Sequence, residues 1–362
     1  MSQDSFPIRR LDHVRHYVNN ARQSAYYYQH VFGFNITGYA GLETGQRTQV
    51  DWLLEQKDIR LVFSAPVAPG HPLAGQIAEH GDFVQDIAFE VDDVDWAFKT
   101  AVGRGAKPAR EPFSMEDDHG SVRVASIHTY GDTLHSFINR DKYTGHWWPG
   151  MRKENIPGDP LGLIEVDHCV GNVELGKMNV WVKWYEDVLG FRNMLTFDDK
   201  DIATEYTSLM SKVMASGNGR VKFPINEPAQ GKKKSQIDEF LDFFGGAGCQ
   251  HVAMRTDDII HTVSRLQARG LEFLKAPHAY YEALPGRVGT IDEDIAELEE
   301  LGILVDRDDE GYLLQIFSKP VTDRPTLFYE IIHRKGAQSF GKGNFKALFE
   351  AIEREQAIRG TL

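Results

Sequence analysis

The tetrapeptide Leu-Asp-His-Val at residues 11–14 returns as Val-Asp-His-Cys at residues 166–169. A longer stretch, Tyr-Gln-His-Val-Phe-Gly-Phe at residues 28–34, returns as Tyr-Glu-Asp-Val-Leu-Gly-Phe at residues 185–191. Self-similarity of this kind is typical of a duplicated structural module. We therefore predict that the chain consists of two related halves.

Two further matches extend the repeat, between residues 84–88 and 249–253 and between residues 133–138 and 326–331. In this alignment the halves differ in residues able to bind a metal: the first has His13, Asp86 and Phe137, and the second has His168, His251 and Glu330. Two imidazoles and one carboxylate are the ligand set of mononuclear non-haem Fe(II) sites with open coordination positions. The second half is predicted to be catalytic and the first to be structural.

Composition narrows the class of protein. The chain has 362 residues, of which 41% are hydrophobic, and a formal net charge of −13. This acidity argues against nucleic-acid binding, which needs a basic face to neutralise phosphates. Only two cysteines are present, so no disulfide framework exists. We find no signal-peptide core and no apolar run long enough to cross a bilayer. A cytoplasmic protein without a membrane or nucleic-acid partner is expected.

Each half is predicted to begin with a strand, continue into an amphipathic helix that ends at a Gly-Phe pair, and finish with several strands. The helices are expected at residues 21–32 and 178–189, with Gly33 and Gly190 as their C-terminal stops. Such β-α-β-β-β units pair into open, curved sheets, which gives an α+β fold. Proline and glycine are dense between the halves, and we place the domains at residues 1–156 and 157–362.

The second half is longer than a plain copy of the first. The extra length falls at about residues 278–306, where residues 291–301 have the composition of an inserted helix that would cover the site. A final helix is predicted at about residues 344–359, because apolar side chains recur at i, i+3, i+4 and i+7 from Phe345. This helix is a candidate lid.

Strand periodicity gives a separate test of the proposed ligands. His168 shares one strand face with Val166 and Val170, and Glu330 shares a face with Phe328. A carboxylate among apolar side chains is costly to bury unless a cation compensates it. Taken alone, each residue is also consistent with an ordinary core histidine or a solvated glutamate. It is the joint occurrence at matched repeat positions that favours a metal.

Several long motifs resemble one known family. They lie at residues 216–254, 311–317, 323–330 and 341–349, and they include Gly-Ala-Gly-Cys-Gln-His-Val-Ala at 246–253. These segments resemble the 4-hydroxyphenylpyruvate dioxygenases. The resemblance is strongest from about residue 160 to the C-terminus, whereas the first half is similar mainly in its repeat pattern and layout.

The resemblance implies a fold of two tandem vicinal-oxygen-chelate domains, similar to glyoxalases and extradiol dioxygenases, with the metal in the C-terminal domain. It implies one Fe(II) per chain, bound by His168, His251 and Glu330. It also implies the conversion of 4-hydroxyphenylpyruvate and O2 into homogentisate and CO2 in tyrosine catabolism. Family members are commonly homodimers or homotetramers, so one of these assemblies is expected.

The matching motifs also imply substrate contacts. The expected polar residues of catalysis are Ser211, Asn226, Gln236 and Gln315. The expected substrate-binding residues are Pro224, Phe317, Phe328, Phe345, Phe349 and Asn344. Phe328 and Phe349 are equally consistent with ordinary core packing, and amides near apolar strands often satisfy backbone groups. The role of Gln250 stays open, because alternation points it away from His251.

Other functions share parts of this pattern. A 4-hydroxymandelate synthase would use the same substrate and ligands but hydroxylate the benzylic carbon. The segment Pro224–Asn226 and Phe345 favour the ring-hydroxylating enzyme, as its family has these residues. An extradiol dioxygenase would act on a catechol, and the long C-terminal match argues against it. A non-catalytic binding protein of the same fold would show no iron-dependent O2 uptake, and the retained ligand set argues against this reading.

Overall fold

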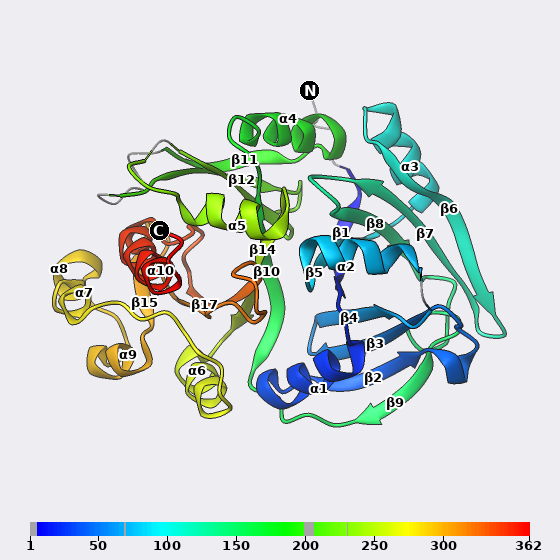
Figure 1. Cartoon of the computed structure of the whole chain (residues 1–362), viewed down its shortest axis with the longest axis horizontal. Coiled ribbons are helices and arrows are strands. Elements are labelled where there is room, and N and C mark those ends of the chain that lie inside the picture. Colours follow the sequence, from blue (N-terminus) through cyan, green and yellow to red (C-terminus); the bar gives the residue numbers. More distant parts are fainter. Residues whose placement is uncertain (1–5, 69, 199–205, 230) are drawn as a thin grey trace.

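The chain folds into two mixed sheets that lie side by side, the first built by the N-terminal half and the second by the C-terminal half (Figure 1). The computed structural model describes residues 6–68, 70–198, 206–229 and 231–362. Helices pack on the outer faces of both sheets and between them.

The first sheet has nine strands in the order β6-β7-β8-β5-β1-β4-β3-β2-β9. Its elements in chain order are β1 (Ile8–Tyr17), α1 (Ala21–Phe32), β2 (Asn35–Ala40), β3 (Gln49–Gln56), β4 (Ile59–Pro66), α2 (Pro72–His80), β5 (Phe83–Val91), α3 (Val94–Gly103), β6 (Pro108–Asp117), β7 (Gly120–His128), β8 (Leu134–Asn139) and β9 (Arg152–Ile156). A short 3-10 turn, η1 (Leu42–Thr44), follows β2.

The second sheet has eight strands in the order β11-β12-β13-β10-β14-β17-β16-β15. Its first elements are β10 (Leu163–Asn172), α4 (Met178–Leu189), β11 (Arg192–Phe197), β12 (Leu209–Ala215), β13 (Lys222–Pro228), α5 (Gln236–Phe244), β14 (Gly248–Thr256) and α6 (Ile259–Ala268). They are followed by α7 (His278–Glu282), α8 (Leu284–Val288), α9 (Ile295–Leu301), β15 (Leu304–Arg307), β16 (Tyr312–Phe317), β17 (Phe328–Lys335), η2 (Lys342–Asn344) and α10 (Phe345–Arg359).

Both halves repeat the same topology, which confirms the predicted duplication. In each, a β-α-β-β-β unit is joined by a short helix to a second such unit, and the first strands of the two units pair antiparallel at the centre of the sheet. In the first half these strands are β1 and β5, and in the second they are β10 and β14. The expected α+β class and the curved, paired units are therefore confirmed.

The helices after the first strand of each half begin and end where the sequence predicted. The side chain of Asn20 accepts a hydrogen bond from the backbone of Gln23 and caps α1. Gly33 and Gly190 end α1 and α4 with φ angles of 77° and 62°. This left-handed conformation is one that a residue with a Cβ adopts only at a cost.

The insertion of the second half differs from the single helix that was predicted. It contains the three short helices α7, α8 and α9, which contact one another, α6 and β15. Asp294 caps α9, so that helix begins at Ile295 rather than at residue 291. These helices lie at the outer side of the second half in Figure 1.

The structure also corrects the predicted alignment by one residue. Asp86 lies opposite Leu134, and its counterpart His251 lies opposite Phe328. The residue equivalent to Glu330 is therefore Ser136 and not Phe137. Because the side chains of a strand alternate between faces, a slip of one residue places the wrong residue in the site.

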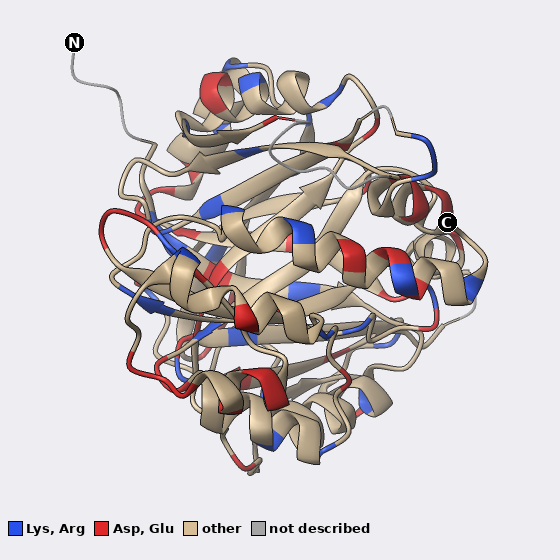
Figure 2. Ribbon diagram, turned by 90° about the vertical axis from the view of Figure 1, so that its left-hand side faces the viewer, with Lys and Arg blue, Asp and Glu red and all other residues tan. Residues whose placement is uncertain are grey.

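The two halves share one hydrophobic core between their sheets, which includes Phe32, Phe89, Cys169, Cys249 and Met254. Both cysteines are free and buried there, as expected for packing residues. Charged residues of both signs are interspersed over the helices of the second half (Figure 2). Within the described residues, no helix is long and apolar enough to span a membrane.

A buried polar link crosses this core. The Tyr329 hydroxyl lies 2.9 Å from the Tyr28 hydroxyl and 3.0 Å from Nε2 of His16. Burial lowers the pKa of His16 to about 3, so its ring is neutral at pH 7 and Nε2 can accept the hydrogen bond. The link ties β17 of the second half to β1 and α1 of the first.

We predict that Tyr329→Phe lowers the free energy of unfolding by about 1–3 kcal/mol, because it leaves buried polar atoms on Tyr28 and His16 without their partner. Urea denaturation of the full chain measures the change. Tyr26→Phe is the matched control, since Tyr26 is 62% exposed. Equal stabilities of the two variants would show that the link contributes nothing.

Candidate metal centre

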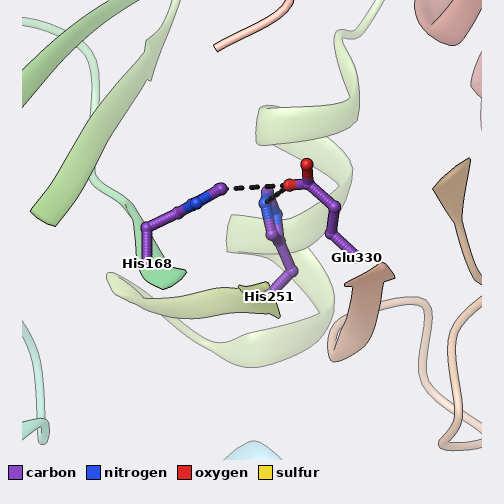
Figure 3. A group of neighbouring side chains, drawn as sticks. All are labelled: His168, His251 and Glu330. Carbon is purple, nitrogen blue, oxygen red and sulfur yellow. Dashed lines mark ion pairs between the residues drawn. The ribbon is translucent and has the colours of Figure 1, made fainter. Parts of the chain in front are cut away.

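Three neighbouring strands bring the predicted ligands together. His168 lies on β10, His251 on β14 and Glu330 on β17, and β14 pairs with both of the other strands. Figure 3 shows the two imidazoles converging on one carboxylate oxygen. Oε2 of Glu330 lies 3.1 Å from Nε2 of His168 and 3.4 Å from Nε2 of His251. All three residues are buried.

The charges of this cluster are unusual for a protein interior. Burial by itself would raise the pKa of Glu330, but the adjacent imidazoles of His168 and His251 lower it to about 2. Glu330 is thus an anion, and the nearest groups are the nitrogens of two imidazoles. An anion and two nitrogen donors, buried and close enough to share one ion, fit a divalent transition-metal ion.

The outer nitrogen of each ligand histidine has an acceptor. Nδ1 of His168 lies 2.7 Å from Oδ1 of Asp167, and Nδ1 of His251 lies 3.0 Å from Oε1 of Gln250. An acceptor at Nδ1 places the ring proton there and leaves the Nε2 lone pair directed at the centre. This is the tautomer that a metal ligand requires.

Asp167 reaches His168 because β10 has a bulge. Val166 pairs with Met254 and His168 pairs with Ala253, so Asp167 is one residue more than the partner strand has. An extra residue of this kind interrupts strict alternation and can direct its side chain to the functional face.

A second bulge, on β14, brings the side chain of Gln250 to the site. Val170 pairs with His251 and Gly171 pairs with Cys249, so Gln250 is the extra residue there. Simple alternation points Gln250 away from His251, whereas the bulge brings its amide to the ring. The sequence left the role of Gln250 open. Asp167 was not predicted, although the Asp-His dipeptide that occurs in both halves was a signal that could have identified it.

Arg334 completes the support of His168. Its Nε and Nη2 donate to the two oxygens of Asp167 at 2.7 and 2.8 Å. Burial would raise the pKa of Asp167, but Arg334 and His168 hold it well below its usual range. Arg334 also donates to the backbone oxygen of Ser339 at 2.6 Å. Sequence reasoning missed Arg334, because it lies beyond the ligand on β17.

A cavity of about 70 Å³ adjoins the ligands. Besides the three ligands, eight of the ten predicted catalytic and substrate-binding residues line it: Ser211, Pro224, Asn226, Gln236, Phe317, Phe328, Phe345 and Phe349. The His251 ring stacks on Phe328 with centroids 4.7 Å apart, and the His168 ring meets the edge of Phe340 at 4.9 Å. Phe340 was not predicted.

Two predicted residues are not part of the cavity wall. Asn344 is fully buried, and its Oδ1 accepts hydrogen bonds from Tyr280 at 2.6 Å and from Arg287 at 3.1 Å. These bonds hold η2 against the insertion. Gln315 is also buried and lies against Gly341, and its amide has no hydrogen-bond partner among the described residues.

The cover of the cavity comes from α10 rather than from the insertion. Phe345, Leu348 and Phe349 of α10 line the cavity, whereas no residue of α7, α8 or α9 does so. The C-terminal end of α10 is hydrogen-bonded to α5. Nε and Nη2 of Arg359 donate to the two carboxylate oxygens of Glu239 at 3.0 and 2.8 Å. The apolar face of α10 thus forms one wall of the cavity.

The sequence of the chain is similar to a known superfamily and to known enzymes. Residues 10–144 and 166–316 match the Glyoxalase/Bleomycin resistance protein/Dioxygenase superfamily. The chain is 47% identical to a 4-hydroxyphenylpyruvate dioxygenase of Yarrowia lipolytica, over 100% of this chain and 95% of that protein. It is also 47% identical to one of Xenopus tropicalis, over 97% of this chain and 92% of that protein.

A solved structure is similar over the whole chain. It is a mutant of 4-hydroxymandelate synthase from Streptomyces coelicolor, with a TM-score of 0.85 and 30% sequence identity, and the match covers 97% of this chain and 99% of that one. The identity to this synthase is lower than that to the two dioxygenases. By its full-length identity to these dioxygenases, the chain belongs to the 4-hydroxyphenylpyruvate dioxygenase family, within the glyoxalase and dioxygenase superfamily.

Proposed function

We propose that the protein is an Fe(II)-dependent dioxygenase that converts 4-hydroxyphenylpyruvate and O2 into homogentisate and CO2, a reaction of tyrosine catabolism. The observation that carries this proposal is the buried His168, His251 and Glu330 cluster in a chain 47% identical to 4-hydroxyphenylpyruvate dioxygenases over its full length. One Fe(II) per chain would be held by these three residues.

The donor set fits iron better than a structural metal. Two neutral imidazoles and a carboxylate without thiolates are typical of non-haem Fe(II) sites that keep positions open for substrate and oxidant. When bound, the metal would supply a chelation site for the 2-oxo acid and the redox chemistry with O2. The remaining tasks belong to the protein.

The first task is to orient the phenol ring. Ser211 and Asn226 are cross-strand partners on β12 and β13, and Gln236 at the start of α5 lines the same cavity. They supply one hydroxyl and two amides, which can donate to or accept from a phenolic hydroxyl. We infer that they fix the ring so that the carbon that carries the side chain faces the metal.

The second task is to exclude water and to hold the ring flat. Phe317 and Phe328 lie beside His251, and Phe345 and Phe349 line the cavity from α10. Aromatic walls give a planar substrate a large apolar contact at low entropic cost. A dry cavity also protects the reaction from side reactions with solvent.

The sister reaction of 4-hydroxymandelate synthase uses the same substrate. Its solved mutant is similar to this chain in fold, but Pro224, Asn226 and Phe345 favour ring hydroxylation by their resemblance to the dioxygenases. Oxygen uptake by the Fe(II)-loaded protein with 4-hydroxyphenylpyruvate, followed by NMR of the product, tests the proposal. Homogentisate is expected, 4-hydroxymandelate would assign the sister reaction, and no uptake would refute both.

The wider organisation of the protein follows from the same assignment. We infer that residues 1–156 form a domain without a metal site and residues 157–362 the catalytic domain, because β9 ends the first sheet at Ile156 and β10 begins the second at Leu163. Assembly as a homodimer or homotetramer and a cytoplasmic location stay predictions, which light scattering and cell fractionation would check.

We predict that Glu330→Gln abolishes oxygen uptake and stoichiometric Fe(II) binding, because the amide removes the only anionic ligand from the centre. Iron per chain after gel filtration and oxygen consumption are the two measurements. Glu297→Gln is the control, since Glu297 is exposed on α9. A Glu330→Gln protein that retains one iron per chain would refute the assignment of this ligand.

We predict that Asp167→Asn weakens Fe(II) binding by about 10–100-fold, as expected when the partner that orients a ligand histidine is lost. Titration of the metal-free protein with Fe(II) under argon measures the affinity. Asp12→Asn is a matched control, because Asp12 holds the equivalent position beside His13 in the first half. The assignment fails if both variants bind iron with equal affinity.

A further inference from the structure

The concave face of the first sheet has a cavity of its own, of about 350 Å³. It lies where the first half repeats the metal centre, since His13, Asp86 and Ser136 line it. A volume above 300 Å³ is typical of small-molecule sites. The cavity is about five times as large as the one beside the metal ligands.

The first half has kept the support of its histidine. Nδ1 of His13 lies 2.6 Å from Oδ1 of Asp12, and Arg140 donates to both oxygens of Asp12, as Arg334 does to Asp167. Asp12 is again the extra residue of a bulge. Nε2 of His13 is buried and has no hydrogen-bond partner among the described residues. His13 thus lines the cavity with a ring whose unpaired Nε2 acceptor is buried beside the cavity, within a small side-chain shift of a bound ligand.

The two other ligand positions no longer suit a metal. Asp86 accepts hydrogen bonds from the backbone and the hydroxyl of Ser136, at 3.0 and 2.5 Å, so both carboxylate oxygens are engaged. Ser136 replaces the glutamate, and its hydroxyl also lies 2.7 Å from that of Ser126. These residues form a polar floor with hydroxyl groups, which suits an organic ligand.

A row of polar residues continues this floor to the edge of the sheet. Arg110 on β6 lies opposite Ser126 on β7, and Ser126 lies opposite Ser136 on β8. Arg110 is exposed at the rim and has no acidic partner within the described part of the chain. Its guanidinium lies over the Phe113 ring at 5.3 Å. The rim thus offers a cation that pairs with no carboxylate of the described residues.

The wall between base and rim is aromatic. Trp148 and Phe113 line the cavity, and the Arg15 guanidinium lies 4.9 Å from the centroid of the Trp148 ring. Arg15 uses Nη1 for Asp51 and Ser64, at 3.1 and 2.9 Å. The rest of the lining is largely polar, so the aromatic side chains form one side of the cavity and the polar groups the other.

We propose that this cavity is a second ligand site, which binds a small aromatic acid that carries a hydroxyl group. The hydroxyl donates to Nε2 of His13, the ring lies between Trp148 and Phe113, and the carboxylate pairs with Arg110. The substrate and product of the proposed reaction belong to this chemical class. The site itself does not rest on that reaction, because it uses no metal and no residue of the second half.

The test is a titration of the full chain, freed of metal with a chelator, with 4-hydroxyphenylacetate. Quenching of tryptophan fluorescence reports this site, because Trp148 lines it whereas no tryptophan lines the cavity beside the metal ligands. Saturable quenching that disappears in Trp148→Phe is expected. Since no turnover is measured, the outcome is independent of whether the protein is a dioxygenase.

Variants of Arg110 and His13 test whether these two residues bind the carboxylate and the hydroxyl of the ligand. Arg110→Gln is expected to weaken binding about tenfold through loss of a charge-assisted hydrogen bond, and His13→Phe by a similar factor. Arg123→Gln is the matched control, because Arg123 lies on the neighbouring β7 and donates to Asp95 on α3, away from the cavity. Phenylacetate, which lacks the hydroxyl, is expected to bind the unchanged chain more weakly than 4-hydroxyphenylacetate.

Two results would overturn the proposal. Absence of saturable quenching would show that the cavity holds only water. Quenching that Arg110→Gln leaves unchanged would assign binding to another part of the chain, and this variant decides the matter even if His13→Phe does not fold, because Arg110 is exposed.

Discussion

The buried carboxylate of Glu330 is the constraint on which the second half depends. A lone anion in a protein interior costs several kcal/mol unless cations or hydrogen bonds compensate it. Here a cation held by Glu330 and the two imidazoles on adjacent strands would compensate it, and the imidazoles are fixed by Asp167 and Gln250. The order of β10, β14 and β17 in the sheet, the bulges in β10 and β14 and the aromatic cover from α10 all serve this one group.

Much of this could be predicted from the sequence, because the duplicated motifs fix both the module and the ligand positions. The helices after β1 and β10 followed from apolar spacing and from Gly33 and Gly190. Two features could not be predicted, and both concern strand register. A Thr-Leu pair that occurs in both halves shifted the predicted alignment of β8 and β17 by one residue. The sequence therefore matched Phe137 with Glu330, whereas the strand pairing matches Ser136 with Glu330. Bulges interrupt alternation at Asp167 and Gln250 and are set by tertiary pairing rather than by local composition.

The comparison of the halves separates what the fold needs from what the chemistry needs. Both halves keep a histidine whose Nδ1 faces an aspartate that an arginine holds. Only the second half keeps the other two ligands. The orienting group is therefore part of the module, because removal of either member of a buried aspartate–arginine pair leaves an uncompensated charge whether or not a metal is near. The ligands are individual side chains that substitution can replace without disturbing that pair.

The core shared between the sheets has a consequence for how such a protein diverges. Phe89 of the first half and Met254 of the second belong to the same apolar cluster. Tyr329 is hydrogen-bonded to Tyr28 and His16. Each half alone would therefore expose apolar and polar groups that are buried in the full chain. Selection for stability therefore retains the first half as a folding partner whether or not its own pocket holds a metal. The pocket of the first half is then free to acquire a new ligand, because substitutions among its lining residues leave the core shared by the two halves intact.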